Sequence, residues 1–259
     1  MKPRVLIKIG GRAFEGRQGF HALAGAIKRD GSLEVIMVHG GGSEVSQALK
    51  NANRETVFVD GLRVTQAEDM KIVEDVLSER VNKRIASFLR ESGVPCKRMS
   101  GKTDRLFVVE PLTRHGHSLG YVGRIIQVNP RPVLDCLKKG EVPVVSPISA
   151  DDQGISYNVN ADSAAAALAV ASACTDLVYF SDVPGVRVGK AILSAVTVEE
   201  AKALIDDGTV KGGMVAKIES AFEALTGRVK QVHITQWQGE NTLKGIISRE
   251  STVGTTIHF

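Results

Sequence analysis

The segments RVLIKIGG (residues 4–11) and EVIMVHGGG (residues 34–42) carry the strongest fold signal in this chain of 259 residues. Each is a short, nearly continuous apolar run that ends in glycines. Strands of this kind are buried on both faces, as in parallel sheets. We therefore predict buried strands at 4–9 and 34–39, and three more at 143–146, 177–181 and 229–235.

Longer amphipathic segments separate these strands. Apolar residues recur at helical spacing over 66–92 and again over 214–225, with Gly93 and Gly227 as stops. Thr197 and Glu200 have the spacing of a capping box. This alternation predicts an α/β fold, a three-layer α/β/α sandwich with a mainly parallel central sheet. We expect a single domain over 1–259, with an N-lobe at 1–170, a C-lobe at 171–259 and a β-rich excursion at 111–128 suited to a lid.

The composition excludes several classes of protein. The formal net charge is only +4, and no basic run is interleaved with aromatic residues, so we expect no nucleic-acid partner. The three cysteines are widely spaced, which argues against a disulfide framework or a zinc site. The sequence shows neither a signal peptide nor an apolar run of membrane-spanning length. We expect a cytoplasmic protein with no membrane partner.

Lys8 interrupts the first apolar strand, and lysine is rarely buried without a partner. At the carboxyl end of a parallel strand it would point toward a ligand crevice, although an edge-strand lysine that reaches solvent is the alternative. The two glycine clusters would lie at the same sheet edge, where main-chain N–H groups can approach an anion. Neither cluster matches the Walker A or the G-x-G-x-x-G pattern, which argues against a P-loop enzyme and a dinucleotide oxidoreductase.

The most distinctive stretch is YNVNADSAAAA (residues 157–167). Asp162 is expected at the N-cap or in the first turn of an alanine-rich helix, where helix capping alone would explain it. Asn158, Asn160 and Asp162 alternate, so an extended chain would place all three on one side. Lys217 falls in the first turns of a later helix and opposes the helix dipole, which an anion bound there would explain.

Two further residues stand near the predicted ligand edge. Arg63, in DGLRVT, has the chemistry to clamp a carboxylate through two parallel hydrogen bonds, but most arginines are surface residues. His39 precedes the glycine triplet, and we interpret it as a packed histidine at a strand end. The histidines show no metal-ligand spacing, and no serine stands in a nucleophile elbow, so covalent hydrolase chemistry has no support.

Seven blocks occur in a specific order: VLIKIGG (5–11), VHGGG (38–42), GLRVT (61–65), NVNAD (158–162), FSDVPGV (180–186), GGMVAK (212–217) and GTTI (254–257). This order and spacing resemble the amino acid kinase superfamily and, within it, the acetylglutamate kinases. That resemblance implies ATP-dependent phosphorylation of the side-chain carboxylate of N-acetyl-L-glutamate in arginine biosynthesis. It also implies Mg²⁺ carried by the nucleotide phosphates, with no metal site of the protein's own.

The resemblance further implies a role for each matching residue. Lys8 would hold the γ-phosphoryl group in flight, Lys217 would stabilise charge on the ATP side, and Asp162 would orient both lysines. The implied substrate-binding residues are Gly41 and Gly42, through their N–H groups, Arg63 at the α-carboxylate and Asn158 at the acetylated amide. The implied ATP-binding residues are Gly10, Gly11, Ser181, Asp182, Val183, Pro184, Gly185, Val186, Arg187, Thr209, Val210 and Lys211.

The sequence departs from the family pattern mainly on the nucleotide side, at VRVGKA (186–191), Lys211-Gly212 and TQWQGEN (235–241). It also enters its first strand near Arg4, whereas arginine-inhibited hexameric members carry a helix before that strand. We therefore predict a homodimer that L-arginine does not inhibit, with the 66–92 helix as its contact face.

Two alternatives remain open at this point. One is a kinase for N-succinylglutamate or for a carrier-protein-linked aminoadipate or glutamate, although NVNAD favours the acetyl substrate. The other is a regulator that binds a nucleotide or an amino acid without catalysis. The joint presence of Lys8, Asp162 and Lys217 argues against that regulator.

Overall fold

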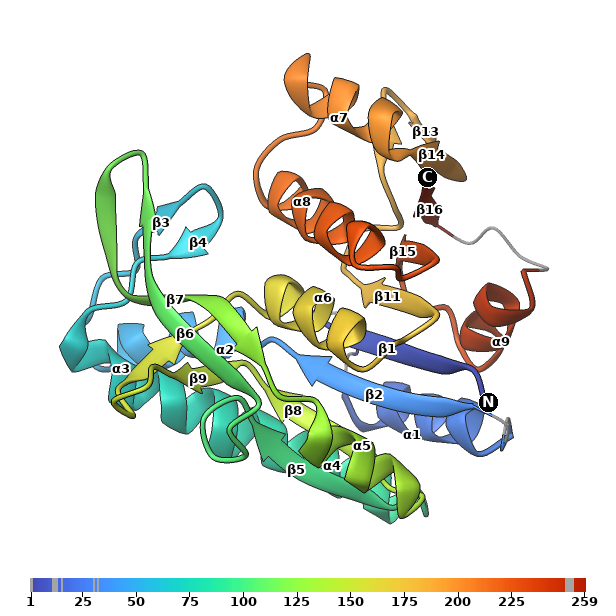
Figure 1. Cartoon of the computed structure of the whole chain (residues 1–259), viewed down its shortest axis with the longest axis horizontal. Helices are drawn as coiled ribbons and strands as arrows, with labels where there is room; N and C mark the ends of the chain where they lie inside the picture. The colour runs from blue at the N-terminus through green and yellow to red at the C-terminus, as the bar shows by residue number, and fades with distance from the viewer. Residues whose placement is uncertain (1, 11–13, 15, 30, 32, 250–253) are drawn as a thin grey trace.

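A computed structural model describes residues 2–10, 14, 16–29, 31, 33–249 and 254–259. Its central sheet has eight strands in the order β14-β16-β15-β11-β1-β2-β8-β5 (Figure 1). Their bounds are β1 Arg4–Ile9, β2 Glu34–His39, β5 Cys96–Ser100, β8 Val142–Ser146, β11 Asp176–Phe180, β14 Ala195–Thr197, β15 Gln231–Thr235 and β16 Thr255–His258. Neighbours pair in parallel except β15 with β16, which confirms the mainly parallel sheet.

Helices cover both faces of this sheet, which confirms the three-layer sandwich (Figure 1). One face carries α5 (Arg131–Lys138), α6 (Ala161–Ala171), α7 (Val198–Asp206) and α8 (Gly213–Thr226). The opposite face carries α1 (Gly16–Arg29), α2 (Gly42–Asn51), the segment at 67–91 and α9 (Asn241–Ser248). Strand β1 alternates between the two cores, since Leu6 packs with the α6 side and Val5 and Ile7 with the α1 side.

The segment at 67–91 is helical throughout, but it is not one α-helix as the periodicity predicts. Two α-helices, α3 (Ala67–Glu74) and α4 (Asn82–Glu91), flank a π-helix, η1 (Asp75–Val81). Apolar spacing does not distinguish the two helix types over so short a stretch, because both keep one side of the segment against the core. π-helical turns are often found at functional sites.

A second, smaller sheet closes into a barrel of β10 (Ser156–Asn158), β7 (His117–Val128), β6 (Phe107–Arg114) and β9 (Ile148–Ala150). The β6–β7 hairpin is the excursion expected at 111–128, with its turn at His115–Gly116. A shorter hairpin, β3 (Phe58–Val59) and β4 (Leu62–Arg63), lies beside it (Figure 1). The two turns meet where His115 Nε2 lies 2.9 Å from Asp60 Oδ2. A last hairpin is β12 (Arg187–Val188) with β13 (Ala191–Ile192).

Several local predictions are confirmed. Helix α7 begins with the expected capping box, in which Thr197 Oγ1 accepts from the Glu200 N–H and Glu200 Oε2 accepts from the Thr197 N–H. Helix α8 spans the predicted 214–225 stripe. The three cysteines are buried free thiols. None of the helices in the described ranges is both long and apolar enough to cross a bilayer.

Candidate active site

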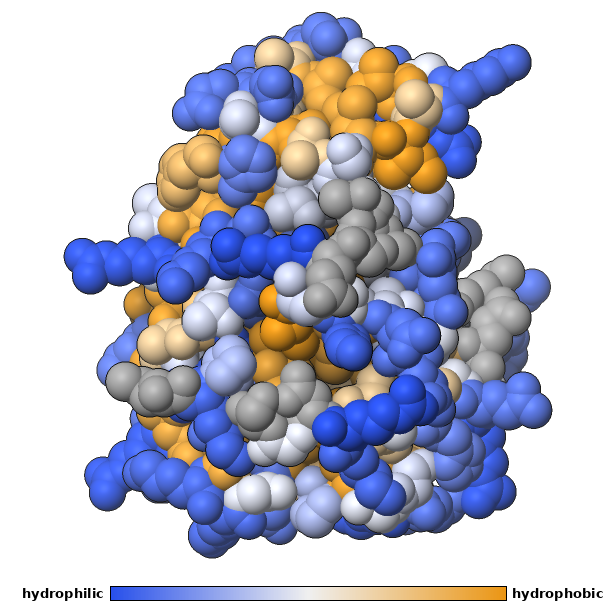
Figure 2. All heavy atoms as spheres, turned by 90° about the vertical axis from the view of Figure 1, so that its right-hand side faces the viewer, coloured by the Kyte–Doolittle hydropathy of each residue, from blue (hydrophilic) through white to orange (hydrophobic). Residues whose placement is uncertain are grey.

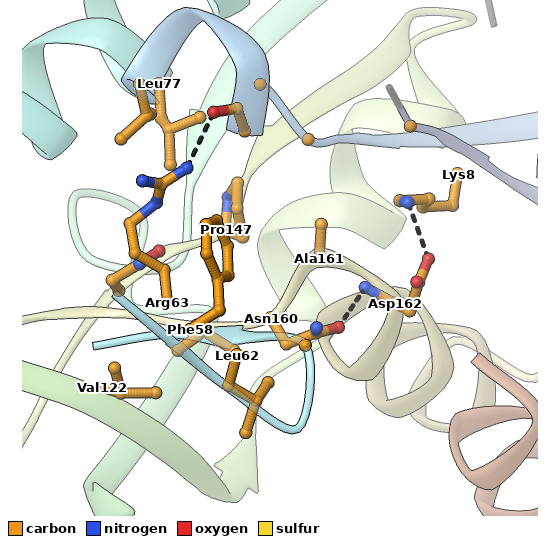
Figure 3. Close-up of a pocket in the computed structure, with 18 residues that line it drawn as sticks. Lys8, Phe58, Leu62, Arg63, Leu77, Val122, Pro147, Asn160, Ala161 and Asp162 are labelled. Carbon is orange, nitrogen blue, oxygen red and sulfur yellow. Dashed lines mark hydrogen bonds and ion pairs between the residues drawn. The ribbon is translucent and has the colours of Figure 1, made fainter. Parts of the chain in front are cut away.

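The candidate site lies where β1 and β2 end at the carboxyl edge of the sheet. There, a cavity of about 200 Å³ is bounded by the glycine loop at 40–42, the β3–β4 hairpin, and the entry to α6 (Figure 3). Strand β1 pairs with β2 on one side and, on the other, with β11, which the chain reaches only after it has formed β8 and β5. Ligands of open α/β sheets bind at such an edge. Gly11 was expected here too, but it lies outside the described residues.

Lys8 and Asp162 line one end of this cavity, and Lys217, which is not among the lining residues, pairs with Asp162. Lys8 Nζ forms an ion pair with Asp162 Oδ1 at 2.7 Å, and Lys217 Nζ donates a hydrogen bond to Asp162 Oδ2 at 2.8 Å. Lys8 comes from β1, Asp162 from the first turn of α6 and Lys217 from α8. All three are buried, with exposed fractions of 7–8%. The carboxylate thus holds two ammonium groups close together and leaves the cluster one positive charge in excess.

Burial alone would raise the pKa of Asp162, but the adjacent Lys8 and Lys217 outweigh it and hold that pKa well below its usual range. Burial is also the largest influence on Lys8 and lowers its pKa, while the Asp162 carboxylate partly offsets that effect. Asp162 is therefore ionised at neutral pH. A cluster that is buried, cationic and open to a cavity is suited to an anionic ligand.

Local contacts explain how these side chains are held. A Cβ at Gly10 would overlap Lys8 Nζ and displace the lysine side chain from its present position. Asn160 Oδ1 accepts from the N–H groups of Asp162 and Ser163 and so caps α6. Asp162 is thereby released from capping, which is the alternative explanation for an aspartate at this point. Lys217 Nζ also lies 5.0 Å from the centre of the Tyr179 ring, in a cation–π contact.

The expectation that Asn158, Asn160 and Asp162 share one side holds only in part. All three line the cavity, but Asn160 is engaged as the helix cap. Asn158 lies in β10, and its Nδ2 donates to Thr65 Oγ1 at 3.1 Å. The chain turns into α6 after Asn160, so the extended spacing does not continue to Asp162.

Arg63 forms the opposite wall of the cavity (Figure 3). It lies in the short strand β4 and is buried, with 8% of its surface exposed. Its Nη2 donates to the Gly42 carbonyl at 2.7 Å and to Ser46 Oγ at 2.8 Å, which ties it to the first turns of α2. The Phe58 ring lies 4.8 Å from its guanidinium carbon. These contacts fix the guanidinium at the cavity and explain why it is not a surface arginine.

The glycine loop supplies main-chain donors to the same cavity. Gly41 is the N-cap of α2, and helix termini leave their first N–H groups without intrahelical partners. Gly41 has φ +156°, and a Cβ there would lie 2.7 Å from Leu77 and 3.2 Å from Val81 of η1. Only glycine fits this position, so the π-helical segment and the loop are packed directly against each other.

The expected nucleotide residues lie mainly along the loops after β11 and α7. Gly10 pairs with β11, since its N–H donates to the Phe180 carbonyl. Asp182 lies just after β11, and its carboxylate raises the pKa of Lys8. This effect is smaller than those of burial, Asp162 and Lys217. Val186 and Val210 are buried in the core, so only their backbone groups remain for a ligand. Thr209 donates its N–H to Asp207 Oδ1.

Apolar side chains gather in the upper part of the molecule in Figure 2, where Figure 1 shows α7, β13 and the C-terminus. The β12–β13 hairpin carries the exposed apolar residues Val188 and Ile192, close in sequence to the expected nucleotide loop. Gln236 also reaches this loop and donates from Nε2 to the Asp182 carbonyl.

The sequence-based prediction missed several residues that build the site. Ser46 and Phe58 hold Arg63, Thr65 holds Asn158, and Tyr179 contacts Lys217. Thr65 could have been found, because it belongs to the GLRVT block. The others come from separate segments and carry no local signal.

Comparison with known proteins assigns the family. Residues 3–236 match the model of the amino acid kinase family. The acetylglutamate kinase of Geobacillus stearothermophilus is 39% identical over 235 residues, which are 90% of each chain. The crystal structure of smu.665 from Streptococcus mutans UA159 superposes with a TM-score of 0.85 at 30% identity, covering 100% of this chain and 99% of that one.

The N-acetylglutamate synthase of Neisseria gonorrhoeae, solved with coenzyme A and N-acetyl-glutamate, shares the fold with a TM-score of 0.86. It is 23% identical, and the match covers 100% of this chain but 60% of that longer one. The family model, the relatives matched over most of their length and the topology of the sheet agree. This chain belongs to the amino acid kinase family.

Proposed function

We propose that this protein is an acetylglutamate kinase, which transfers the γ-phosphoryl group of ATP to the side-chain carboxylate of N-acetyl-L-glutamate in arginine biosynthesis. The observation that carries the proposal is the buried Lys8–Asp162–Lys217 cluster at the cavity. Relatives 35–39% identical over most of this chain, which are acetylglutamate kinases, support the same activity.

The chemistry needs no covalent intermediate. A carboxylate oxygen of the substrate forms a bond to the γ-phosphorus, the bond from that phosphorus to the β,γ-bridging oxygen breaks, and its electron pair leaves with ADP. The carboxylate is already ionised at neutral pH, so no general base is required. What the step demands is in-line positioning and positive charge around the transferring group. In the proposal Lys8 and Lys217 supply that charge, and Asp162 keeps both ammonium groups in place.

The substrate would lie between the two ends of the cavity. Arg63 would pair with its α-carboxylate, and Asn158 would meet the acetylated amide. The N–H groups of Gly41 and Gly42 would bind the reacting carboxylate. This assignment is supported by the buried, fixed guanidinium of Arg63 on one wall and the lysine cluster on the other.

ATP would lie along the loops at 181–187 and 209–211 with Gly10 at its phosphates. Its anionic phosphates suit the excess positive charge of the lysine cluster, and the exposed Val183 and Val188 suit an adenine ring. Mg²⁺ would be carried by the nucleotide phosphates, where it would supply further positive charge beside Lys8 and Lys217.

The division of labour between the lobes follows from these assignments. Residues 1–170 would bind the acylated amino acid and form the homodimer, and residues 171–259 would bind ATP. A reaction that consumes ATP, in a chain with three free thiols, suits the cytoplasm.

The test is an ADP-release assay with N-acetylglutamate, N-succinylglutamate, glutamate and aminoadipate, each with ATP and Mg²⁺. Trapping with hydroxylamine detects the acyl phosphate directly. We expect turnover and hydroxamate with N-acetylglutamate. Faster turnover with another acceptor would reassign the substrate, and ATP binding without turnover on any acceptor would favour a regulator.

A further inference from the structure

His39 is a buried titratable residue that the proposed chemistry does not use. It ends β2 directly before the glycine triplet and is 1% exposed. The cavity wall includes Gly40, Gly41 and Gly42 but not His39. The imidazole therefore lies behind the glycine loop, on the side away from the ligand.

Asn82, the first residue of α4, holds one side of this imidazole and is itself 1% exposed. Its amide has one possible orientation. Arg98 Nε can only donate and lies 3.0 Å from Asn82 Oδ1, while the Val144 carbonyl can only accept and lies 2.9 Å from Nδ2. The Nδ2 group is therefore a donor toward His39 Nε2, 3.1 Å away.

This contact decides where the His39 proton is. Because Nε2 must accept from Asn82, the proton of the neutral ring is on Nδ1. That Nδ1–H donates to the Gly40 carbonyl at 2.7 Å. Burial lowers the pKa of His39 to about 4, so the ring is neutral at physiological pH.

The hydrogen bond to Gly40 sets the orientation of the next peptide. The peptide is planar and trans, so the Gly41 N–H points opposite to the Gly40 carbonyl. Since that carbonyl faces His39 behind the loop, the Gly41 N–H is directed toward the cavity. The side chains of Leu77 and Val81 in η1 pack against Gly41 and limit its movement.

We propose that His39 and Asn82 are positioning residues for the acylated substrate. Asn82 selects the Nδ1–H tautomer of His39, and that tautomer holds the Gly40–Gly41 peptide with its N–H aimed at the reacting carboxylate. Neither residue touches the substrate. The inference rests on the proposed function for the identity of that substrate.

The tautomer can be measured without any turnover. In protein labelled with ¹⁵N-histidine, the His39 signal, identified among the six histidines by its loss in His39→Gln, should report a neutral Nδ1–H ring. It should not titrate between about pH 5.5 and 8, although an ordinary histidine titrates near 6.5. An Nε2–H ring, or titration in that range, would overturn the proposal. Because this readout needs no substrate, it separates failure of the inference from failure of the proposed function.

Two substitutions of His39 test its effect on substrate binding. Asparagine can place its amide nitrogen where Nδ1 lies and keep the bond to Gly40, whereas glutamine places its amide at the Nε2 position and loses it. We expect His39→Gln to raise the KM for N-acetylglutamate about tenfold, the equivalent of one lost hydrogen bond, with the KM for ATP little changed. His39→Asn should remain close to the parent protein.

The control for removing a buried imidazole is His233→Gln. His233 is buried on β15 and contacts Thr256 and Asp176, outside the cavity. It should leave both KM values unchanged, whatever its effect on thermal stability. Equal KM values in His39→Asn and His39→Gln, or an equal rise for both substrates, would contradict a positioning role.

Asn82→Asp provides a pH readout. A carboxylate at 82 accepts from Nε2–H, so it raises the His39 pKa and, above that pKa, leaves the Nδ1 lone pair facing the Gly40 carbonyl. Other charges acting on this site are Glu44, Arg84 and the Arg98 guanidinium. We expect the KM for N-acetylglutamate to rise with pH more steeply in this variant than in the parent protein. Parallel pH profiles would refute the tautomer link.

Discussion

Lys217 on α8 donates a 2.8 Å hydrogen bond to Asp162 on α6, across 55 positions of sequence. The other oxygen of the same carboxylate pairs with Lys8 on β1. One buried acid on α6 therefore sets the separation of two cations, one from β1 and one from α8. In the proposed reaction, this places positive charge at the transferring phosphoryl group before ATP binds, which limits reorganisation during transfer.

Removing either lysine should slow phosphoryl transfer. We expect Lys8→Ala and Lys217→Ala each to lose about 2–4 kcal/mol of transition-state stabilisation, measured as kcat/KM in the ADP-release assay. Lys138→Ala is the control, because that lysine is exposed and pairs only with Asp135 in the described structure. Turnover at the parent rate in either variant would remove that lysine from the mechanism.

Asp162→Asn should make stability depend more strongly on ATP. Without the carboxylate, two buried ammonium groups face each other unpaired, and such an arrangement costs about 3–5 kcal/mol when one partner of a buried pair is removed. The phosphates of bound ATP would supply the missing negative charge. We expect a lower Tm in the free variant and a larger rise of Tm with MgATP than in the parent protein. Equal ATP-induced shifts would be inconsistent with phosphates near this cluster.

Asp162 should also affect how the free energy of unfolding depends on pH under acidic conditions. Lys8 and Lys217 lower the pKa of Asp162 in the folded protein from its ordinary value of 3.8. The stability that Asp162 contributes is therefore present above about pH 4 and is lost as pH falls through the native pKa. Asp162→Asn lacks this contribution at every pH. The difference in free energy of unfolding between parent and variant should therefore narrow below about pH 4 in urea titrations. A constant difference down to about pH 2 would show that Asp162 is not the titrating group.

Arg63→Lys should weaken binding of the acylated amino acid. Lysine cannot bond Gly42 and Ser46 while also presenting a planar pair of donors to a carboxylate. We expect the KM for N-acetylglutamate to rise about tenfold or more, with a smaller effect on the KM for ATP. Arg131→Lys, at a side chain 87% exposed, is the matched control. An unchanged KM would exclude Arg63 from the substrate site.

The quaternary structure provides a separate prediction. We expect a homodimer by light scattering, with the helical segment at 67–91 as its contact face and no inhibition by L-arginine. Charge reversal at exposed Arg80 and Arg84 of that segment should weaken the dimer, whereas Lys138→Glu on α5 should not. A hexamer, or strong inhibition by arginine, would contradict the prediction.

Much of the fold follows from local sequence. Apolar runs between glycines specify the parallel strands, and the period of two in β1 places Lys8 on the same face as Leu6, toward α6 and α8. The capping box at Thr197 forms within one helical turn, and the glycines at 40–42 begin the helix that directly follows them. These features were predictable because each depends on neighbours in the chain.

Local sequence is therefore enough to predict the sandwich, the glycine loops, the lysine within an apolar strand at Lys8 and the lysine that opposes a helix dipole at Lys217. Packing between distant segments sets Asp162 between Lys8 and Lys217. It also brings Ser46 and Phe58 to Arg63, and Asn82 to His39. These contacts join residues that are far apart along the chain. Periodicity and capping are local, whereas these contacts depend on how separate layers pack against one sheet, which no single segment encodes.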